Sequence, residues 1–223
     1  MSPRCVTIGN ATLYQADNSD IVDIIENHDL LLTDPPYGIG ESKNKNRGGF
    51  VNGKRVESTI FAGNEDWDLR KYDCSDFIPW INRCQTSVIW GGNYFGMPAS
   101  ARWLVWDKQN FSSDFSDCEL AWSNQNKGSV RIFRHMWNGM LRASEKKTPR
   151  VHPTQKPVKL MEWCIDLVKP VSSVLDPFMG SGSTGVACVN MGISFTGIEK
   201  DTAYFEIACE RIRAASDQYR LAL

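Results

Sequence analysis

Several short apolar runs in this chain stop abruptly at residues that end regular structure. The clearest run is Leu-Leu-Leu-Thr at 30–33, which is followed by Asp34, two prolines and Tyr37. Proline cannot donate to a strand ladder, and it keeps the residue before it out of the helical region. The pattern therefore predicts a buried strand that ends at Asp34 and runs into a rigid turn.

The rest of the chain alternates between strand and helix patterns. The last part predicts a strand at 173–175, a turn at 176–182, a helix at 183–191, a strand at 193–198 and a helix at 202–216. Earlier segments predict a hairpin at 5–14, a helix capped by Ser19, helices at 73–84 and 157–168, and strands at 87–90, 103–106, 117–122 and 129–134. The final βαβα order is typical of a parallel sheet, so we expect an α/β fold.

Length and composition favour one domain spanning residues 1–223. Two full domains would be cramped in 223 residues. Residues 38–64 show no periodicity and are rich in Gly, Asn, Lys and Arg, which predicts a long flexible loop. The seven cysteines include no C-x-x-C pair, and no apolar run approaches the roughly 20 residues of a membrane span. We therefore expect a reduced, cytoplasmic protein with no structural zinc and no membrane partner.

Charge is spread unevenly, although the formal net charge is only -1. Residues 1–36 carry six acids and one arginine, whereas residues 127–159 carry nine lysines or arginines and the single acid Glu145. A local excess of positive charge of this kind indicates a surface that contacts phosphates.

The turn after the strand at 30–33 carries groups suited to a flat ring that bears an amino group. The carboxylate of Asp34 and the carbonyl of Pro35 are both acceptors, and can receive the two hydrogens of an exocyclic NH2. Pro36 helps to stiffen the backbone, and the ring of Tyr37 can stack on a base. By itself, such a segment is also compatible with an ordinary proline-rich turn.

A second motif, G-x-G-x-x-G, spans Gly180 to Gly185 between a predicted strand and a predicted helix. Glycines there let the backbone approach a ligand closely, as in proteins that bind dinucleotides, so an NAD-binding domain is one alternative. Against that alternative, only 38 residues follow Gly185, which is too few for a second mononucleotide-binding half unless the fold is permuted.

Together, the two motifs resemble those of amino-group DNA methyltransferases that use S-adenosylmethionine. Asp-Pro-Pro-Tyr at 34–37 is similar to their catalytic motif, and Asp-Pro-Phe-Met-Gly-Ser-Gly-Ser-Thr at 176–184 is similar to their cofactor turn. The segment 152–157 resembles the one that flanks the methionine end of the cofactor. The order of the motifs is that of the beta arrangement, and the acid of the catalytic motif usually accompanies N6-adenine rather than N4-cytosine methylation.

The resemblance implies a Rossmann-like methyltransferase fold, with a mostly parallel twisted sheet, helices on both faces and a small basic target-recognition insertion at 108–150. The catalytic residues would be Asp34, Pro35, Pro36 and Tyr37. The cofactor-binding residues would be Asp34, Thr154, Gln155, Lys156, Asp176, Pro177, Phe178, Gly180, Gly182, Thr184, Glu199 and Lys200. The predicted DNA contacts are Lys43, Lys45, Arg47, Arg131, Arg134, Arg142, Lys146 and Lys147.

The sequence thus predicts a site-specific methyltransferase that flips adenine out of double-stranded DNA and methylates its N6 amino group without a metal. Cytosine N4 methylation and an inactive DNA-binding scaffold are the alternatives. The resemblance leaves open a homodimer and a cognate restriction enzyme as partners.

Overall fold

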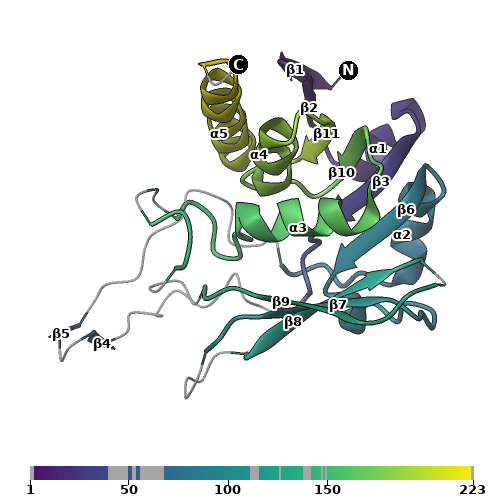
Figure 1. Ribbon diagram of the computed structural model, residues 1–223. Helices are drawn as coiled ribbons and strands as arrows, with labels where there is room; N and C mark the ends of the chain where they lie inside the picture. Colours follow the sequence, from purple (N-terminus) through teal and green to yellow (C-terminus); the bar gives the residue numbers. More distant parts are fainter. Residues whose placement is uncertain are drawn as a thin grey trace.

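The computed structural model describes residues 3–39, 50–51, 54–55, 68–110, 116–125, 127–137, 142–146, 148 and 150–221. Nine strands form one sheet in the order β1-β2-β11-β10-β3-β6-β8-β7-β9, and β4 and β5 form a separate two-stranded ladder (Figure 1). Among the described residues, no helix is long and apolar enough to cross a bilayer.

The strands are β1 (Arg4–Ile8), β2 (Ala11–Gln15), β3 (His28–Thr33), β4 (Phe50–Val51), β5 (Lys54–Arg55), β6 (Cys84–Trp90), β7 (Trp103–Asp107), β8 (Cys118–Ser123), β9 (Arg131–Arg134), β10 (Ser173–Asp176) and β11 (Ser194–Glu199). The helices are α1 (Asn18–Ile21), α2 (Cys74–Ile81), α3 (Val158–Val168), α4 (Ser183–Asn190) and α5 (Thr202–Leu221).

The sheet has a parallel centre and antiparallel pairs toward both edges. Strands β2, β11, β10, β3 and β6 are parallel to one another and form the centre. Strand β1 pairs with β2, and β8 with β6 and β7, in antiparallel fashion, and the last strand, β9, is parallel to β7. From β10 the chain proceeds to β11 on one side, and from β3 it proceeds to β6 on the other. The carboxyl ends of β3 and β10 therefore flank the switch point of the sheet, where open α/β folds bind ligands.

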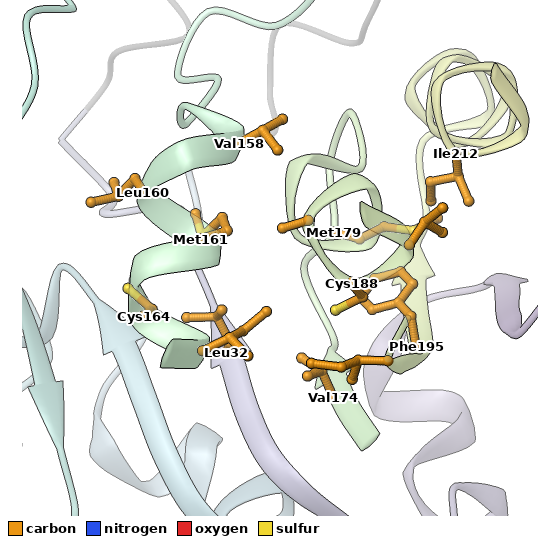
Figure 2. Close-up of a cluster of buried hydrophobic side chains, with 14 of the residues drawn as sticks. Leu32, Val158, Leu160, Met161, Cys164, Val174, Met179, Cys188, Phe195 and Ile212 are labelled. Atoms are coloured by element: carbon orange, nitrogen blue, oxygen red, sulfur yellow. The ribbon is translucent and has the colours of Figure 1, made fainter. Parts of the chain in front are cut away.

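Two hydrophobic cores lie on the two faces of the sheet because successive strand residues point to opposite sides. Leu30 and Leu32 of β3 belong to the core beneath α3, α4 and α5, whereas Leu31 belongs to the core beneath α1 and α2. Figure 2 shows the first core, where Leu32, Val174 and side chains of the three helices meet. The helices therefore cover both faces, as the sequence predicts.

The predicted hairpin at 5–14 is present as β1 and β2, with Gly9 at φ +59 in its turn. The predicted cap of the next helix was wrong, because Asp17 is the N-cap and accepts a hydrogen bond from the Ser19 backbone at 3.1 Å. Asp17 takes this role because it lies two residues before Ser19, directly before the helix, where its carboxylate can accept from the free N–H groups of the first turn. Most of the predicted loop at 38–64 lies outside the described residues.

Candidate active site

Asp34 lies directly beyond β3 and its carboxylate makes two close contacts. Its Oδ1 accepts a hydrogen bond from the hydroxyl of Tyr37 at 2.9 Å, and its Oδ2 accepts one from Lys156 Nζ at 2.5 Å. Its side chain is only 17% exposed. The turn predicted from the two prolines therefore holds Asp34 and Tyr37 as a unit, which we call the acidic platform.

A second carboxylate, Glu119 of β8, completes a partly buried cluster of charges around this platform. Glu119 Oε2 lies 3.0 Å from Lys156 Nζ and 3.0 Å from the Tyr37 hydroxyl, whose single hydrogen can be donated to Glu119 or to Asp34. Its other oxygen lies 2.5 Å from the Nζ of Lys108, which follows β7. Two carboxylates and two ammonium groups thus balance in charge, and Lys156 bridges the two acids.

The cluster shifts the pKa values of its two acids in opposite directions. Burial alone would raise the pKa of Glu119, but the ammonium groups of Lys156 and Lys108 outweigh it and lower that pKa to about 2. Among the described residues, Lys156 is the one cationic partner of Asp34, which also faces Glu119, so burial prevails and the pKa of Asp34 lies above its usual value. Burial and the two carboxylates raise the pKa of Tyr37 well above its usual value, so its hydroxyl stays protonated and acts as the donor.

The ring of Tyr37 is packed on both the backbone and other aromatic rings. It stacks on Tyr94 with ring centroids 4.9 Å apart and an interplanar angle of 20°, and it meets Phe95 edge-on at 6.1 Å. A Cβ atom built on Gly91 would lie 2.2 Å from Tyr37 Cε1. The absence of a side chain at Gly91, just beyond β6, is therefore what lets the Tyr37 ring lie in this position.

The turn between β10 and α4 is organised by Asp176, which is 2% exposed. Its carboxylate accepts hydrogen bonds from the hydroxyls of Thr33 and Thr184, both at 2.7 Å, and from the Phe178 backbone at 3.1 Å. Burial raises the pKa of Asp176 to about 6 in spite of these donors. Asp176 therefore ties the end of β3, and with it the acidic platform, to the glycine-rich turn.

The three glycines of the G-x-G-x-x-G motif face different surroundings. A Cβ atom on Gly180 would have only the His152 ring within 4 Å, at 3.8 Å or more. On Gly182 it would lie 3.0 Å from Ala208, and on Gly185 2.4 Å from Ile212, both in α5. Gly180 thus faces a cavity, whereas the other two glycines allow close packing of the turn and α4 against α5.

Glu199, the last residue of β11, lies beside this turn. Its carboxylate accepts hydrogen bonds from the backbone N–H groups of Gly180 at 3.0 Å and Asp201 at 2.7 Å. Each oxygen accepts one of them, so acceptor capacity remains on both. Burial raises the pKa of Glu199 to about 7 even with these donors.

A cavity of about 520 Å³ joins the acidic platform to the glycine-rich turn. Residues from all the predicted motifs line it, among them Asp34, Pro35, Pro36, Tyr37, Thr154, Gln155, Lys156, Asp176, Pro177, Phe178, Gly180, Thr184, Glu199 and Lys200. Gly182 is the one predicted cofactor-binding residue that does not line it. The structure therefore brings together motifs that are separated by more than a hundred positions in the chain.

The segment before α3 forms one wall of this cavity. The ring of His152 packs against Tyr204 with centroids 4.2 Å apart and accepts a hydrogen bond from the Thr154 backbone at 3.2 Å. Burial, with nearby cationic groups, lowers the pKa of His152 to about 3, so the ring is neutral. The side chain of Gln155 accepts from the Val151 backbone at 3.0 Å, which orders the approach to Lys156.

The predicted DNA contacts fall into two groups. Arg131 and Arg134 are exposed on the edge strand β9, and Lys146 is exposed in the segment before α3. Arg142 donates to the Thr148 carbonyl at 2.8 Å. The remaining predicted contacts, Lys43, Lys45, Arg47 and Lys147, lie outside the described residues.

Sequence reasoning missed three residues of the site, namely Glu119, Lys108 and Tyr94. Glu119 is the only charged residue in the otherwise apolar core of β8, and that isolation was the available signal. Tyr94 follows the Gly-Gly pair at the end of β6 and is 49% exposed. Nothing in local periodicity indicates that either side chain reaches the acidic platform.

An open α/β sheet with a ligand cavity at its switch point is the arrangement in which enzymes that use nucleotide-containing cofactors place their sites. The DNA methylase family matches residues 98–210, which is half of the chain, and the chain belongs to this family.

Comparisons with individual proteins agree with this family. The chain is 26% identical to the type II methyltransferase M2.LlaDCHI of Lactococcus lactis subsp. cremoris, over 91% of this chain and 89% of the relative. It is 25% identical to the type II methyltransferase M2.DpnII of Streptococcus pneumoniae, over 86% and 85% of the two chains.

Two solved structures share the fold. The M1.HpyAVI-SAM complex superposes with a TM-score of 0.57 at 23% identity, covering 90% of this chain and 99% of that one. The PvuII DNA methyltransferase, described as cytosine-N4-specific, also gives a TM-score of 0.57, at 14% identity, covering 96% and 93%. These likenesses establish the architecture.

Proposed function

We propose that this protein transfers a methyl group from S-adenosylmethionine to the N6 amino group of adenine in DNA. The observation that carries the proposal is the shared cavity, in which the Asp34 carboxylate and the glycine-rich turn open onto the same space. Membership of the DNA methylase family supports DNA as the substrate.

The residues at the glycine-rich end fit an adenosine-containing cofactor. The cavity volume is within the range of about 300–1,000 Å³ that is usual for ligand sites. The Gly180 backbone faces the open space, the aromatic ring of Phe178 lines it, and the Glu199 carboxylate can accept from ribose hydroxyls. Bound there, S-adenosylmethionine would supply a methyl group already activated by a sulfonium.

The acidic platform would act on the target base. The lone pair of an adenine amino group is delocalised into the ring, and acceptors on both N–H bonds favour the pyramidal geometry that attack requires. Asp34 and the Pro35 carbonyl are the acceptors proposed for this role. To reach them the base must leave the duplex, at a cost of about a few kcal/mol. The Tyr37–Tyr94 pair at the platform offers aromatic surface to an extruded base.

The identity of the residue at position 34 supports adenine over cytosine. The motif here begins with an acid, as in the N6-adenine enzymes that it resembles, and N4-cytosine enzymes tend to carry serine there. Within the described part of the chain, the proposed phosphate contacts are Arg131 and Arg134 of β9 together with Arg142 and Lys146.

Mass spectrometry of nucleosides would test the proposal. DNA treated with the protein and S-adenosylmethionine should yield N6-methyladenosine in its deoxy form. N4-methyldeoxycytidine would instead identify a cytosine enzyme on the same platform, and unmodified DNA would refute methyl transfer altogether.

We expect the affinity for S-adenosylmethionine to depend on pH through Glu199. Ribose hydroxyls donate to the ionised carboxylate, and the pKa of Glu199 is raised to about 7. Below that pKa a proton must leave before binding, so affinity should rise up to about tenfold per pH unit and level off above it. Calorimetry on the wild type and on Glu199→Gln would check this, because the variant should lose that slope. Equal slopes of affinity against pH in the two proteins would mean that Glu199 does not bind the ribose.

Substitution of Gly91 by alanine should impair catalysis through Tyr37. The new Cβ would lie 2.2 Å from the Tyr37 ring, so the ring must move and carry its hydroxyl away from Asp34. We expect a fall in kcat of about tenfold or more with cofactor affinity retained. Gly96→Ala is the matched control, because Gly96 also has a positive φ, of +62, but its Cβ position has nothing within 4 Å. Equal activity in the two variants would contradict the role assigned to the Tyr37 position.

A further inference from the structure

Both oxygens of the Asp34 carboxylate already accept a hydrogen bond from a side chain. Oδ2 of Asp34 holds the Lys156 ammonium at 2.5 Å, and Oδ1 holds the Tyr37 hydroxyl at 2.9 Å. An amino group of the target base needs this same carboxylate as its acceptor. An oxygen that already pairs with an ammonium is a weaker acceptor for an uncharged amino group, so Lys156, whose side chain is 5% exposed, competes with the base for Asp34. A buried ammonium left without a partner is strongly unfavourable.

Glu119 is placed to receive that ammonium. Its Oε2 already lies 3.0 Å from Lys156 Nζ, so Lys156 can leave Asp34 while keeping a carboxylate partner. Lys108 pairs with the other oxygen of Glu119 at 2.5 Å and so keeps Glu119 charged whether or not Lys156 moves. The Tyr37 hydroxyl, 3.0 Å from Glu119, can make the same exchange.

The topology explains how a residue outside both motifs reaches the acidic platform. Strand β8 runs antiparallel to β6 and β7, so its first residues lie at the carboxyl edge of the parallel strands. Glu119 pairs with Trp106 of β7, and Lys108 follows one residue beyond that strand. The same sheet edge thus brings together side chains from β3, β7, β8 and the segment before α3.

We propose that Glu119 is a positioning residue of the methyl-transfer reaction, which takes over the Lys156 ammonium when the amino group of the target base occupies Asp34. The inference rests on the proposed function. Glu119 touches neither the base nor the cofactor in this scheme, and acts by freeing the acceptor of Asp34 at little electrostatic cost.

The charged groups around Asp34 determine what substitutions should do to its ionisation. Asp34 faces Tyr37 in its own turn, Lys156 from the segment before α3, and Glu119 from β8. Asp176 of β10 is the remaining nearby acid. In Glu119→Gln a like charge disappears and Lys156 pairs with Asp34 alone, so the Asp34 pKa should fall. In Lys108→Met the pull of Glu119 on Lys156 strengthens, so the Asp34 pKa should rise.

The test is the pH dependence of kcat/KM for the intact protein acting on DNA, because its acid limb reports the free enzyme. Glu119→Gln should shift that limb to lower pH. It should also lower kcat by about tenfold or more, because Lys156 then has Asp34 as its one carboxylate partner among the described residues and the base must compete with that full ion pair. Lys108→Met should shift the limb to higher pH. A loss of packing alone would not shift the acid limbs of the two variants in opposite directions.

Glu206→Gln is the matched control. It removes one carboxylate of an exposed ion pair, with Arg4, and neither residue of that pair contacts the acidic platform. It should leave kcat and the acid limb unchanged. Thermal denaturation and cofactor calorimetry on each variant would check folding, and Lys108→Met keeps the test available if Glu119→Gln does not fold. An active wild type with no shift in either variant, or with shifts in the same direction, overturns the inference alone. A wild type that transfers no methyl group overturns the proposed function and the inference with it.

Discussion

Replacing Asp34 by alanine should abolish methyl transfer while leaving the fold and the cofactor site largely intact. The variant removes the only side-chain acceptor at the end of β3 that faces the shared cavity in the described part of the chain. Loss of one such electrostatic contact in a buried site costs about 10²-fold or more in rate. Cofactor affinity should fall much less, because most of the groups proposed to hold the cofactor belong to other segments, chiefly β11 and the turn before α4.

The stability of this variant is predictable from the same cluster of charges. Lys156 loses one partner but keeps Glu119 at 3.0 Å, so it is not left unpaired. We therefore expect a cooperative thermal transition, with kcat rather than cofactor binding lost. Calorimetry with S-adenosylmethionine and a methyl-transfer assay on the same preparation would separate the two. Lost cofactor binding combined with preserved transfer would mean that the roles of the two motifs had been exchanged.

Elements with strong local signals were predicted well from the sequence. The strand before Asp34, the βαβα unit and the glycine-rich turn each combine apolar periodicity with proline or glycine at a defined position, and each appears where it was expected. Asp176 ends β10 and Asp34 directly follows β3, and because these two strands are parallel neighbours both acids lie at one edge of the sheet. Local sequence is sufficient to predict an element when the residues that form it also determine its structure.

The remainder depends on contacts that a single sequence does not display. Glu119 joins the platform because β8 returns antiparallel beside β6, and strand order is set by the packing of the whole sheet. The three glycines of the motif look equivalent in the sequence, yet α5 lies against two of them and leaves only Gly180 facing the cavity. The sequence predicted that Lys156 lies beside the cofactor. In the structure it lines the cavity, but its described ion pairs are with Asp34 and Glu119.

This difference among the glycines makes Gly180→Val the sharpest test of the cofactor site. A valine Cβ at Gly180 would meet nothing closer than 3.8 Å, so its branched side chain should occupy the cavity beside Glu199 rather than disturb the core. We expect S-adenosylmethionine binding to fall below detection in calorimetry, while thermal stability drops only by the roughly 1–2 kcal/mol of a left-handed backbone.

Two further variants distinguish a blocked site from a damaged fold. Gly96→Val carries the same kind of backbone strain, at φ +62, in open space, and it should retain cofactor binding. Gly182→Val should instead lower the thermal stability markedly, because its Cβ would lie 3.0 Å from Ala208 and 3.3 Å from Ile212 before the branch is added. If Gly180→Val bound the cofactor like the wild type, the cavity face of this turn would have no part in cofactor recognition. The role proposed for Gly180, in which the backbone approaches the cofactor closely, would then be wrong. The packing of Gly182 and Gly185 against α5 would suffice to explain the glycines of the motif.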